Sequence, residues 1–212
     1  MHVIGLTGNI ATGKSTVAEM LRRMGALVID ADKLAHRVMG AGTDVHRRIL
    51  QRFGRDLLGP DGEIDRARLG GIVFADPGAL RDLERIVHPR VVEKTLRLLR
   101  AAPEAVGVVE AIKLIEADMH RYCDAVWVVT SSREQQMQRL KGSRYLTCAE
   151  AALRIDTQPP VAAKLAMADE VIDNSEDLED TWEQVRRAWR RIPKQCPGQA
   201  GSSPLSQAEE AS

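Results

Sequence analysis

The stretch "GNIATGKST", residues 8–16, decides the fold of this 212-residue chain. It follows a short apolar run, "HVIGL" (2–6), and precedes residues 17–24, whose apolar side chains recur at i, i+3, i+4 and i+7. A short continuous apolar run is typical of a buried strand, and the recurrence that follows is typical of one face of a helix. The sequence therefore predicts a strand, a glycine-rich loop and a helix, which Gly25 ends.

The next segment, "ALVID" (26–30), has the apolar composition of a second strand and closes with an acid. A strand, a loop, a helix and a further strand make up a βαβ unit, from which parallel sheets are built. Three later runs predict the remaining strands: "VGVVE" (106–110), "AVWVV" (125–129) and the weaker "EVID" (170–173). We therefore expect an α/β fold with a parallel sheet.

Residues 31–105 separate the second predicted strand from the third, far more chain than a crossover between parallel strands requires. Most of this gap has helical patterns, such as "DRARLGGIVF" (65–74) and the stretch that starts at Pro89, "PRVVEKTLRLLR". The glycine- and proline-containing "GRDLLGPDGEID" (54–65) predicts a turn-rich link. We interpret the gap as a helical insert on the sheet, a natural place for a second substrate.

The carboxyl-terminal part of the chain is predicted to be mainly helical. "SREQQMQRLKG" (132–142) has a helical pattern, and "TCAE" (147–150) has the Thr-x-x-Glu form of a capping box that opens another helix. Pro193 is expected to stop a last helix, and residues 193–212 form a low-complexity tail that we expect to be disordered. One face of that last helix carries Leu178, Trp182, Val185 and Trp189, and we interpret the two tryptophans as packing residues and not as ligand contacts.

Composition excludes several classes of function. The 30 basic and 30 acidic residues cancel, and aromatic residues make up only 3% of the chain, so a nucleic-acid-binding protein is not expected. No segment has the roughly 18 consecutive apolar residues of a membrane span, and the start, "MHVIGLTG", lacks the basic region of a signal peptide. Cys123, Cys148 and Cys196 form no metal or disulfide pattern, which favours a cytoplasmic protein with reduced thiols.

Residues 8–15 fit the P-loop pattern G-x-x-x-x-G-K-[ST] at every fixed position. Glycines allow main-chain N–H groups to approach an anion, and the following helix adds the positive end of its dipole. Lys14 would place its charge on the β- and γ-phosphates, and the Ser15 hydroxyl would bind Mg²⁺. A glycine turn that only joins strand to helix is the alternative. The candidate nucleotide-binding residues are Gly8, Asn9, Ile10, Ala11, Thr12, Gly13, Lys14, Ser15 and Thr16.

Two carboxylates, Asp30 and Asp32, follow the second predicted strand. Ligands of open α/β sheets bind at the carboxyl ends of the strands, so a carboxylate there could accept the proton of an attacking hydroxyl or hold metal-bound water. The alternative is that one of them only caps a helix. We choose Asp32 as the candidate catalytic residue.

These motifs together resemble the dephospho-CoA kinase family over about residues 1–190. The resemblance is carried, in order, by the P-loop, "IDADKLAHRV" (29–38), "FGRDLLGPDGEIDRARLGGIVFADP" (53–77), "IVHP" (86–89) and "ADEVIDNS" (168–175). It implies that ATP, with Mg²⁺, phosphorylates the 3′-hydroxyl of the ribose of dephospho-CoA, which gives coenzyme A and ADP in the last step of coenzyme A biosynthesis. A small-molecule substrate and a monomer are expected.

The resemblance also implies an architecture: a three-layer α/β/α sandwich of the P-loop NTPase type that forms one kinase unit, residues 1–192. Its core would comprise residues 1–32, 104–138 and 165–192, its helical CoA-binding insert about 33–103, and its small lid about 139–164.

The resemblance implies roles for four residues, of which Asp32 is already a candidate from its position. Asp32 matches the general base of the family, and His88 matches a His-Pro element beside the CoA site. Glu116 takes the place of a family glutamate on the substrate side, and Asn174 matches an element near the adenine of ATP. A structural histidine at a helix start and an ordinary turn asparagine are the alternatives for His88 and Asn174.

The chain departs from the family pattern in two places. "VVEAIKLIEAD" (108–118) lacks the proline of the family and is longer, and within it Glu110 could instead serve the water shell of Mg²⁺. In the lid, Arg144 lies one place later than expected. Arg144 and Arg139 are candidates to neutralise charge on the transferred phosphoryl group, and Arg154 to clamp ATP, with solvated surface arginines as the alternative.

Three other functions stay open at the level of sequence. A different small-molecule or nucleoside monophosphate kinase could share the same core. A GTPase-like switch would need a guanine-reading Asn-Lys-x-Asp, and the sequence contains no such tetrapeptide. A relative that binds nucleotide without turnover is compatible with the altered segment 108–118.

Overall fold

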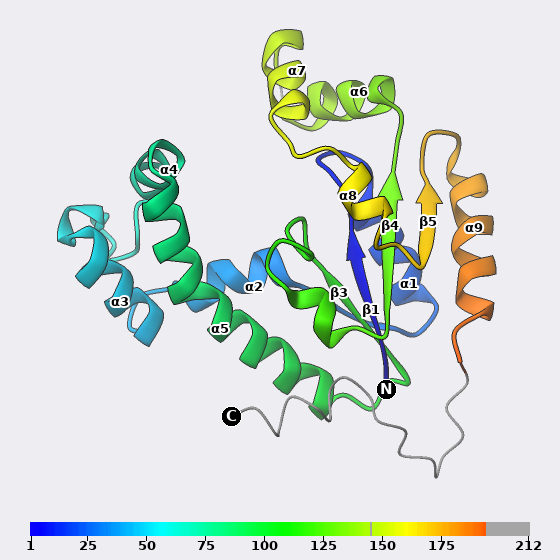
Figure 1. The fold of residues 1–212 in the computed structure, drawn as a ribbon, viewed down its shortest axis with the longest axis horizontal. Helices are drawn as coiled ribbons and strands as arrows, with labels where there is room; N and C mark the ends of the chain where they lie inside the picture. The colour runs from blue at the N-terminus through cyan, green and yellow to red at the C-terminus, as the bar shows by residue number, and fades with distance from the viewer. Residues whose placement is uncertain (145, 194–212) are drawn as a thin grey trace. The chain divides into compact units, whose positions relative to one another are not determined.

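The computed structural model describes residues 1–144 and 146–193, apart from the side chains of Ser143 and Arg144 (Figure 1). The predicted disordered tail therefore lies outside the described residues, except for Pro193. The strands are β1 (His2–Thr7), β2 (Leu27–Asp30), β3 (Val106–Glu110), β4 (Ala125–Thr130) and β5 (Glu170–Asp173). The helices are α1 (Lys14–Arg23), α2 (Ala31–Val38), α3 (Asp44–Phe53), η1 (Arg55–Leu57), α4 (Arg66–Ala75), α5 (Pro77–Ala101), η2 (Met119–Tyr122), α6 (Arg133–Arg144), α7 (Cys148–Asp156), α8 (Ala162–Leu165) and α9 (Leu178–Arg190).

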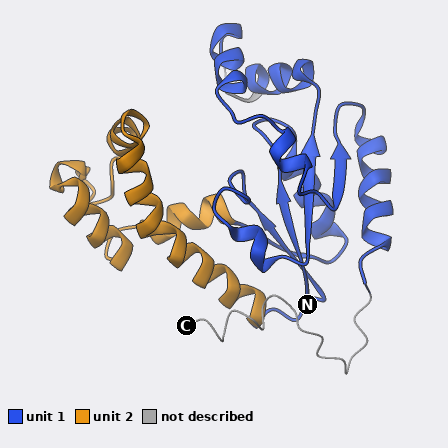
Figure 2. Ribbon diagram, viewed as in Figure 1, with its two compact units in different colours: residues 1–30, 101–212 blue, residues 31–100 orange. Residues whose placement is uncertain are grey.

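The chain divides into two compact units, coloured separately in Figure 2. Unit 1 combines Met1–Asp30 with Ala101–Ser212 and contains every strand named above. Unit 2, Ala31–Arg100, is built from helices.

Unit 1 is organised around a five-stranded parallel sheet in the order β2-β3-β1-β4-β5. The central strand β1 pairs with β3 from His2 opposite Val106 and with β4 from Ile4 opposite Ala125. Because helices or loops cover both faces of such a sheet, its inner strands are mainly apolar, and every residue of β3, the terminal Glu110 included, is buried. The prediction of a parallel α/β fold from five apolar runs is confirmed.

Helices α1 and α9 cover one face of this sheet (Figure 1). Ile4, Leu6 and Trp127 of the sheet belong to one buried cluster with side chains of α1 and of α9. The predicted face of α1 is confirmed, since Val17, Met20 and Leu21 are buried and Met24 packs against the cluster. On α9, Val185 is buried and both tryptophans pack against the cluster, which confirms the interpretation of the tryptophans as packing residues. Leu178 is the first residue of α9 and is 58% exposed, because the helix begins beyond the edge of the core.

The segment after β3 packs on the other face of the sheet, at Gly5. A β-carbon at Gly5 would lie 2.6 Å from Cδ2 of Leu114 and 3.0 Å from Sγ of Cys123. Leu114 is fully buried, so the contact with the backbone of β1 is closed to water. Gly5 therefore allows residues 111–123 to lie directly on the strand that leads into the glycine-rich loop.

Unit 2 follows the helical expectation for residues 31–105. Asp65 caps α4 by accepting hydrogen bonds from the N–H groups of Ala67 and Arg68, as aspartate does at helix starts. The turn-rich link at 54–65 contains η1 and a single antiparallel bridge between Leu58 and Ile64. The helix predicted at "DRARLGGIVF" and the turn prediction are both confirmed.

The helical pattern predicted from Pro89 onward is confirmed, but the helix begins earlier than a helix start at His88–Pro89 would imply, because Pro89 lies inside the 25-residue helix α5. A proline within a helix removes one N–H donor and normally ends or kinks the helix. Here the neighbouring Ile86, Val87 and Val91 are all buried, and the burial of an apolar face on both sides of Pro89 favours continuation of the helix. His88 therefore lies in the middle of a helix.

The capping box at "TCAE" is confirmed at the start of α7. The hydroxyl of Thr147 accepts from the N–H of Glu150, and the Glu150 carboxylate accepts from the N–H of Thr147 at 2.8 Å.

Among the residues that the structure describes, no helix combines the length and the apolar character needed to span a bilayer.

Candidate active site

The loop between β1 and α1 depends on glycine at both ends. Gly8 and Gly13 have φ values of +151° and +91°, in the region that side-chain-bearing residues rarely adopt. A β-carbon at Gly8 would lie 2.3 Å from the carbonyl oxygen of Val129, and one at Gly13 would lie 1.9 Å from Nδ2 of Asn174. The two fixed glycines of the pattern are thus required by conformation and by the close approach of neighbouring groups.

The side chain of Lys14 folds back over this loop. The residue is only 8% exposed, and its Nζ donates to the carbonyl oxygens of Gly8 at 3.0 Å and Asn9 at 3.1 Å. The hydroxyl of Thr12 also donates to the Asn9 carbonyl, at 3.0 Å. These bonds hold a positive charge at the mouth of a loop whose N–H groups lead into the positive end of the α1 dipole, which suits the loop to a polyanion.

Ser15 and Glu110 meet at the carboxyl edge of the sheet. The Ser15 hydroxyl donates to Oε1 of Glu110 at 3.0 Å, and Glu110, the last residue of β3, is 8% exposed. Hydroxyl and carboxylate oxygens are the donors that Mg²⁺ prefers, and Mg²⁺ is commonly held by only one or two protein groups. The two residues fit a magnesium site. From the sequence, Ser15 was expected to bind Mg²⁺, and Glu110 was named as a residue that could serve the water shell of the ion.

Two residues from distant parts of unit 1 hold the loop through its carbonyl groups. Arg139, on α6, donates through Nη1 to the carbonyl oxygens of Ala11 at 3.2 Å and Thr12 at 3.1 Å. Asn174, directly after β5, donates through Nδ2 to the Thr12 carbonyl at 2.9 Å. Because both bind carbonyl oxygens, they fix the loop without using any of its N–H groups. Burial lowers the pKa of the Arg139 guanidinium, which nevertheless remains charged.

Arg139 and Asn174 also bind each other, so the loop is held by a connected network. Nη2 of Arg139 donates to the carbonyl oxygen of Asn174 at 2.8 Å. Oδ1 of Asn174 accepts from the hydroxyl of Thr181 at 2.9 Å, and Asn174 is 4% exposed. The amide orientation of Asn174 is therefore fixed from both ends.

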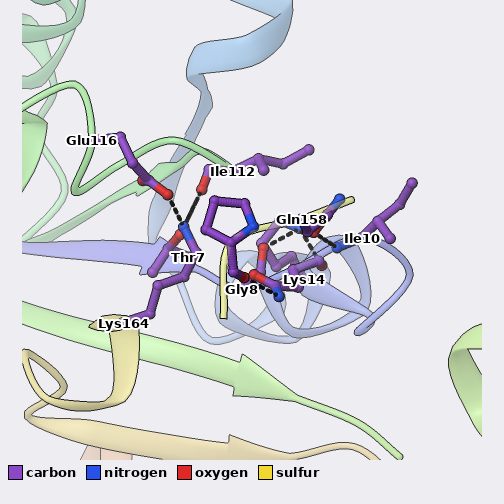
Figure 3. A network of polar contacts seen from close by, with 10 residues as sticks. Thr7, Gly8, Ile10, Lys14, Ile112, Glu116, Gln158 and Lys164 are labelled. Carbon is purple, nitrogen blue, oxygen red and sulfur yellow. Dashed lines mark hydrogen bonds and ion pairs between the residues drawn. The ribbon is translucent and has the colours of Figure 1, made fainter. Parts of the chain in front are cut away.

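The chain that follows α7 contacts the loop near its start (Figure 3). Oε1 of Gln158 accepts from the N–H of Ile10 at 2.8 Å. Nδ2 of Asn9 donates to the carbonyl oxygen of Pro159 at 3.2 Å. Gln158 thus satisfies a loop N–H group, and sequence reasoning missed it because neither its spacing nor its neighbours form a motif.

A buried lysine, Lys164 of α8, lies beside the same loop (Figure 3). Its Nζ donates to the carbonyl oxygen of Ile112 and to Oε1 of Glu116, both at 2.8 Å. The Ile112 carbonyl also accepts from the hydroxyl of Thr7, which directly precedes Gly8, at 3.1 Å. Sequence reasoning missed Lys164, since the lysine of "PPVAAK" (159–164) resembles a solvated surface residue.

The pKa of Glu116 is lowered by this arrangement. Partial burial raises the pKa of the carboxyl, but the hydrogen bond and the charge of Lys164, with a smaller effect from Lys113, outweigh burial. The carboxylate is therefore held ionised, and its side chain is 38% exposed.

The remaining candidate residues are spread over both units. Asp32, in the first turn of α2, and His88, inside α5, belong to unit 2, whereas the glycine-rich loop belongs to unit 1. Arg154 is exposed on α7. Arg144 is the last residue of α6, and its side chain lies outside the described part of the chain. Thr16, on the first turn of α1, is exposed.

The chain is similar to known proteins along nearly its whole length. Residues 2–180 match the family model described as dephospho-CoA kinase. The dephospho-CoA kinase of Geobacter sulfurreducens is 44% identical over 197 residues, which cover 91% of this chain and 100% of the relative. That of Moorella thermoacetica is 43% identical over 198 residues, 92% of this chain and 93% of the relative.

Solved structures show the same relationship. A Thermus thermophilus protein superposes with a TM-score of 0.78 at 30% identity, over 91% of this chain and 98% of its own. The dephospho-CoA kinase of Campylobacter jejuni superposes with a TM-score of 0.65 at 28% identity, over 90% and 96%. Shikimate kinase of Acinetobacter baumannii, at 15% identity and a TM-score of 0.52, shares the fold alone. With these matches and with its glycine-rich loop in place between β1 and α1, the chain belongs to the dephospho-CoA kinase family.

Proposed function

We propose that this protein transfers the γ-phosphoryl group of ATP to the 3′-hydroxyl of dephospho-CoA, which yields coenzyme A and ADP in the final step of coenzyme A biosynthesis. The observation that carries the proposal is the match of residues 2–180 to the dephospho-CoA kinase model. The geometry of residues 8–15 supports it, because a loop with these N–H groups and a buried lysine suits the phosphates of a nucleotide.

The loop would bind ATP through its whole length, residues 8–16. In this role the main-chain N–H groups and the Lys14 ammonium neutralise the charge that spreads over the phosphate oxygens during transfer. Arg139 and Asn174 support binding by holding the loop carbonyls, and Arg154 binds ATP from the lid. We assign to Arg144 the neutralisation of the transferred group.

Ser15 and Glu110 would hold Mg²⁺, since their oxygens already lie 3.0 Å apart and form a donor set that the ion prefers. When bound, the ion would supply neutralisation of the phosphate charge. The residues of the chain contribute its placement: the Ser15 hydroxyl at the start of α1 and the Glu110 carboxylate at the end of β3.

Three residues are assigned to the acceptor substrate. Asp32 would take the proton of the 3′-hydroxyl as general base, while His88 and Glu116 bind dephospho-CoA. We propose that about residues 33–103 form the CoA-binding insert and about residues 139–164 a lid, around a core of residues 1–32, 104–138 and 165–192. A lid that excludes water would limit the unproductive hydrolysis of ATP.

We further propose that the protein is a cytoplasmic monomer that acts on a small molecule and on neither nucleic acid nor membranes. Within the described residues, Cys123 and Cys148 are free thiols, as is usual in a reducing compartment. Light scattering after size exclusion measures the oligomeric state.

The test is an assay of purified protein with MgATP and a panel of acceptors, in which coenzyme A and ADP are both measured. Dephospho-CoA is expected to be phosphorylated with a higher kcat/KM than adenosine, nucleoside monophosphates or shikimate. A preference for a nucleoside monophosphate would show that a different kinase shares this fold. GTP hydrolysis in the absence of any acceptor would favour a switch protein.

A further inference from the structure

Lys164 is the most deeply buried charged group beside the candidate site. The residue is 3% exposed, and its ammonium binds one neutral carbonyl and one carboxylate, those of Ile112 and Glu116. An ammonium loses much hydration free energy when it is buried, so it is retained only where such partners compensate it. The two partners lie 52 and 48 residues before Lys164 in the sequence. The contact therefore ties α8 to the segment that follows β3.

The segment so tied lies against the start of the nucleotide loop. After Glu110, the N–H of Ala111 donates to the carbonyl oxygen of Leu6 at 3.0 Å. The carbonyl oxygen of Ile112 accepts from the Thr7 hydroxyl at 3.1 Å. These bonds anchor the beginning of the segment to the last residues of β1, at the sheet edge where open α/β folds bind their ligands.

Within residues 111–116, which follow β3, the last residue, Glu116, is held in place by Lys164. Glu116 is only partly buried, with a side chain that is 38% exposed, and its Oε1 is held at 2.8 Å by a lysine side chain that is 4% exposed. Figure 3 shows the Glu116 carboxylate and the Ile112 carbonyl converging on the Lys164 ammonium. One carboxylate oxygen is thus fixed by a rigid partner, while the side chain stays accessible to a ligand.

We propose that Lys164 is a positioning residue, which orients the Glu116 carboxylate to accept a hydrogen bond from a hydroxyl or amino group of the acceptor substrate. An ionised carboxylate only accepts hydrogen bonds, so the recognised group must be a donor. The inference deepens the proposed function and rests on it for the identity of the acceptor. It assigns Lys164 to acceptor binding and not to ATP binding, because its two partners belong to residues 112–116 and not to the loop 8–16.

The test compares Lys164→Met with Lys113→Met, which removes the same charge from an exposed position of the same segment. Since a misplaced binding group raises KM without changing the chemical step, Lys164→Met is expected to raise KM for dephospho-CoA about tenfold with kcat within about threefold. The dissociation constant of ATP stays unchanged, and Lys113→Met keeps KM within about twofold of the wild-type value. Lys164→Gln, which retains an uncharged hydrogen-bond donor group, provides the same comparison should Lys164→Met not fold.

A double-mutant cycle separates positioning from a merely structural role. If Lys164 acts through Glu116, the double variant Lys164→Met/Glu116→Gln has a KM no higher than the worse single variant, because the two residues share one interaction. Three results would each overturn the inference. The effects of the two single substitutions on KM could multiply in the double variant. The KM of Lys164→Met could equal that of Lys113→Met, or the dissociation constant of ATP could rise in Lys164→Met by the same factor as KM for dephospho-CoA.

Amide hydrogen exchange gives a readout that does not depend on turnover. Exchange of the amides of residues 113–118 is expected to be about tenfold faster in Lys164→Met than in Lys113→Met, because the segment loses its fixed end. Equal exchange in the two variants would overturn the inference. The two proposals can fail separately. If the wild-type protein does not phosphorylate dephospho-CoA, the proposed function is contradicted. If Lys164→Met still accelerates exchange of residues 113–118 in that case, Lys164 remains the residue that fixes this segment.

Discussion

The side-chain amide of Asn174 occupies the space that a β-carbon on Gly13 would need. Its Nδ2 lies 1.9 Å from that position, because it reaches over Gly13 to donate to the carbonyl oxygen of Thr12 at 2.9 Å. Asn174 cannot easily move away, since its Oδ1 and its carbonyl oxygen bind Thr181 and Arg139. The second glycine of the loop is thus specified by a residue 161 positions away as well as by its own φ of +91°.

Gly13→Ala is therefore expected to lower the free energy of unfolding by about 2–3 kcal/mol, from backbone strain together with the displacement of Asn174. Chemical denaturation followed by circular dichroism measures the change. The matched control is Gly142→Ala on α6, where a β-carbon would meet nothing within 4 Å. That control should gain about 0.5–1 kcal/mol, as alanine usually does over glycine inside a helix. Equal effects of the two substitutions would contradict the role of Asn174.

Lys14→Ala is expected to reduce kcat at least about 100-fold, because the phosphate charge loses its closest positive group. The dissociation constant of ATP should rise as well, as measured by calorimetric titration. Since the Lys14 ammonium donates to two loop carbonyls, circular dichroism should confirm that the variant is folded. Turnover within about threefold of the wild-type value would exclude Lys14 from the reaction.

Asp32→Asn is expected to reduce kcat by about 10²–10⁴ while both substrates still bind, as befits the loss of a general base. Steady-state kinetics and equilibrium binding together separate these two effects. Asp30, the last residue of β2, provides the comparison. A larger loss of kcat in Asp30→Asn than in Asp32→Asn would transfer the role to Asp30.

Glu110→Gln is expected to raise the Mg²⁺ concentration needed for half-maximal nucleotide binding about tenfold, because the Ser15 hydroxyl loses a charged partner. Titration of Mg²⁺ into protein and ATP, without acceptor, measures this directly. Glu134→Gln makes the same charge change at an exposed position in the first turn of α6 and should leave the midpoint unchanged. Identical midpoints in both variants would argue against a metal site at Glu110.

Cys123 is expected to make the stability of the protein depend on alkaline pH. Burial, reinforced by the negative charge of Asp124, raises the pKa of this thiol from 9.0 to about 12. Between these pKa values the thiol is ionised in the unfolded chain but still protonated in the folded protein. The contribution of Cys123 to the free energy of unfolding is therefore complete below pH 9 and is lost as the pH rises towards 12. The free energy of unfolding should therefore fall more steeply with pH in the wild-type protein than in Cys123→Ala. Parallel curves above pH 9 would contradict the raised pKa.

Most of the nucleotide loop could be predicted from sequence, because its determinants are local. Glycines at 8 and 13, followed at once by Lys14 and Ser15, specify a tight turn that leads into a helix. The capping box at 147–150 is equally local, since Thr147 and Glu150, three residues apart, bind each other's backbone and side chains. The strands followed from short apolar runs, because an inner parallel strand is buried on both faces.

Long-range partners could not be predicted from local patterns. Nothing near Lys164 indicates that its ammonium reaches residues 112 and 116, or that Arg139 and Asn174 would meet at the Thr12 carbonyl. At Pro89 the local pattern was the less reliable guide. Proline favours the start of a helix, but the buried apolar residues on either side of Pro89 keep it inside α5. The long-range contacts were not predicted because sequence spacing does not encode them. The helix boundary was not predicted because packing outweighs local propensity.

The distribution of indole rings gives each unit its own optical signal. The three tryptophans, Trp127, Trp182 and Trp189, all belong to unit 1, so residues 31–100 contain none. Intrinsic fluorescence excited at the indole band therefore reports the melting of the sheet and its α9 layer, whereas ellipticity also includes the helices α2 to α5. Any separation between the two transitions measures how independently the helical unit unfolds.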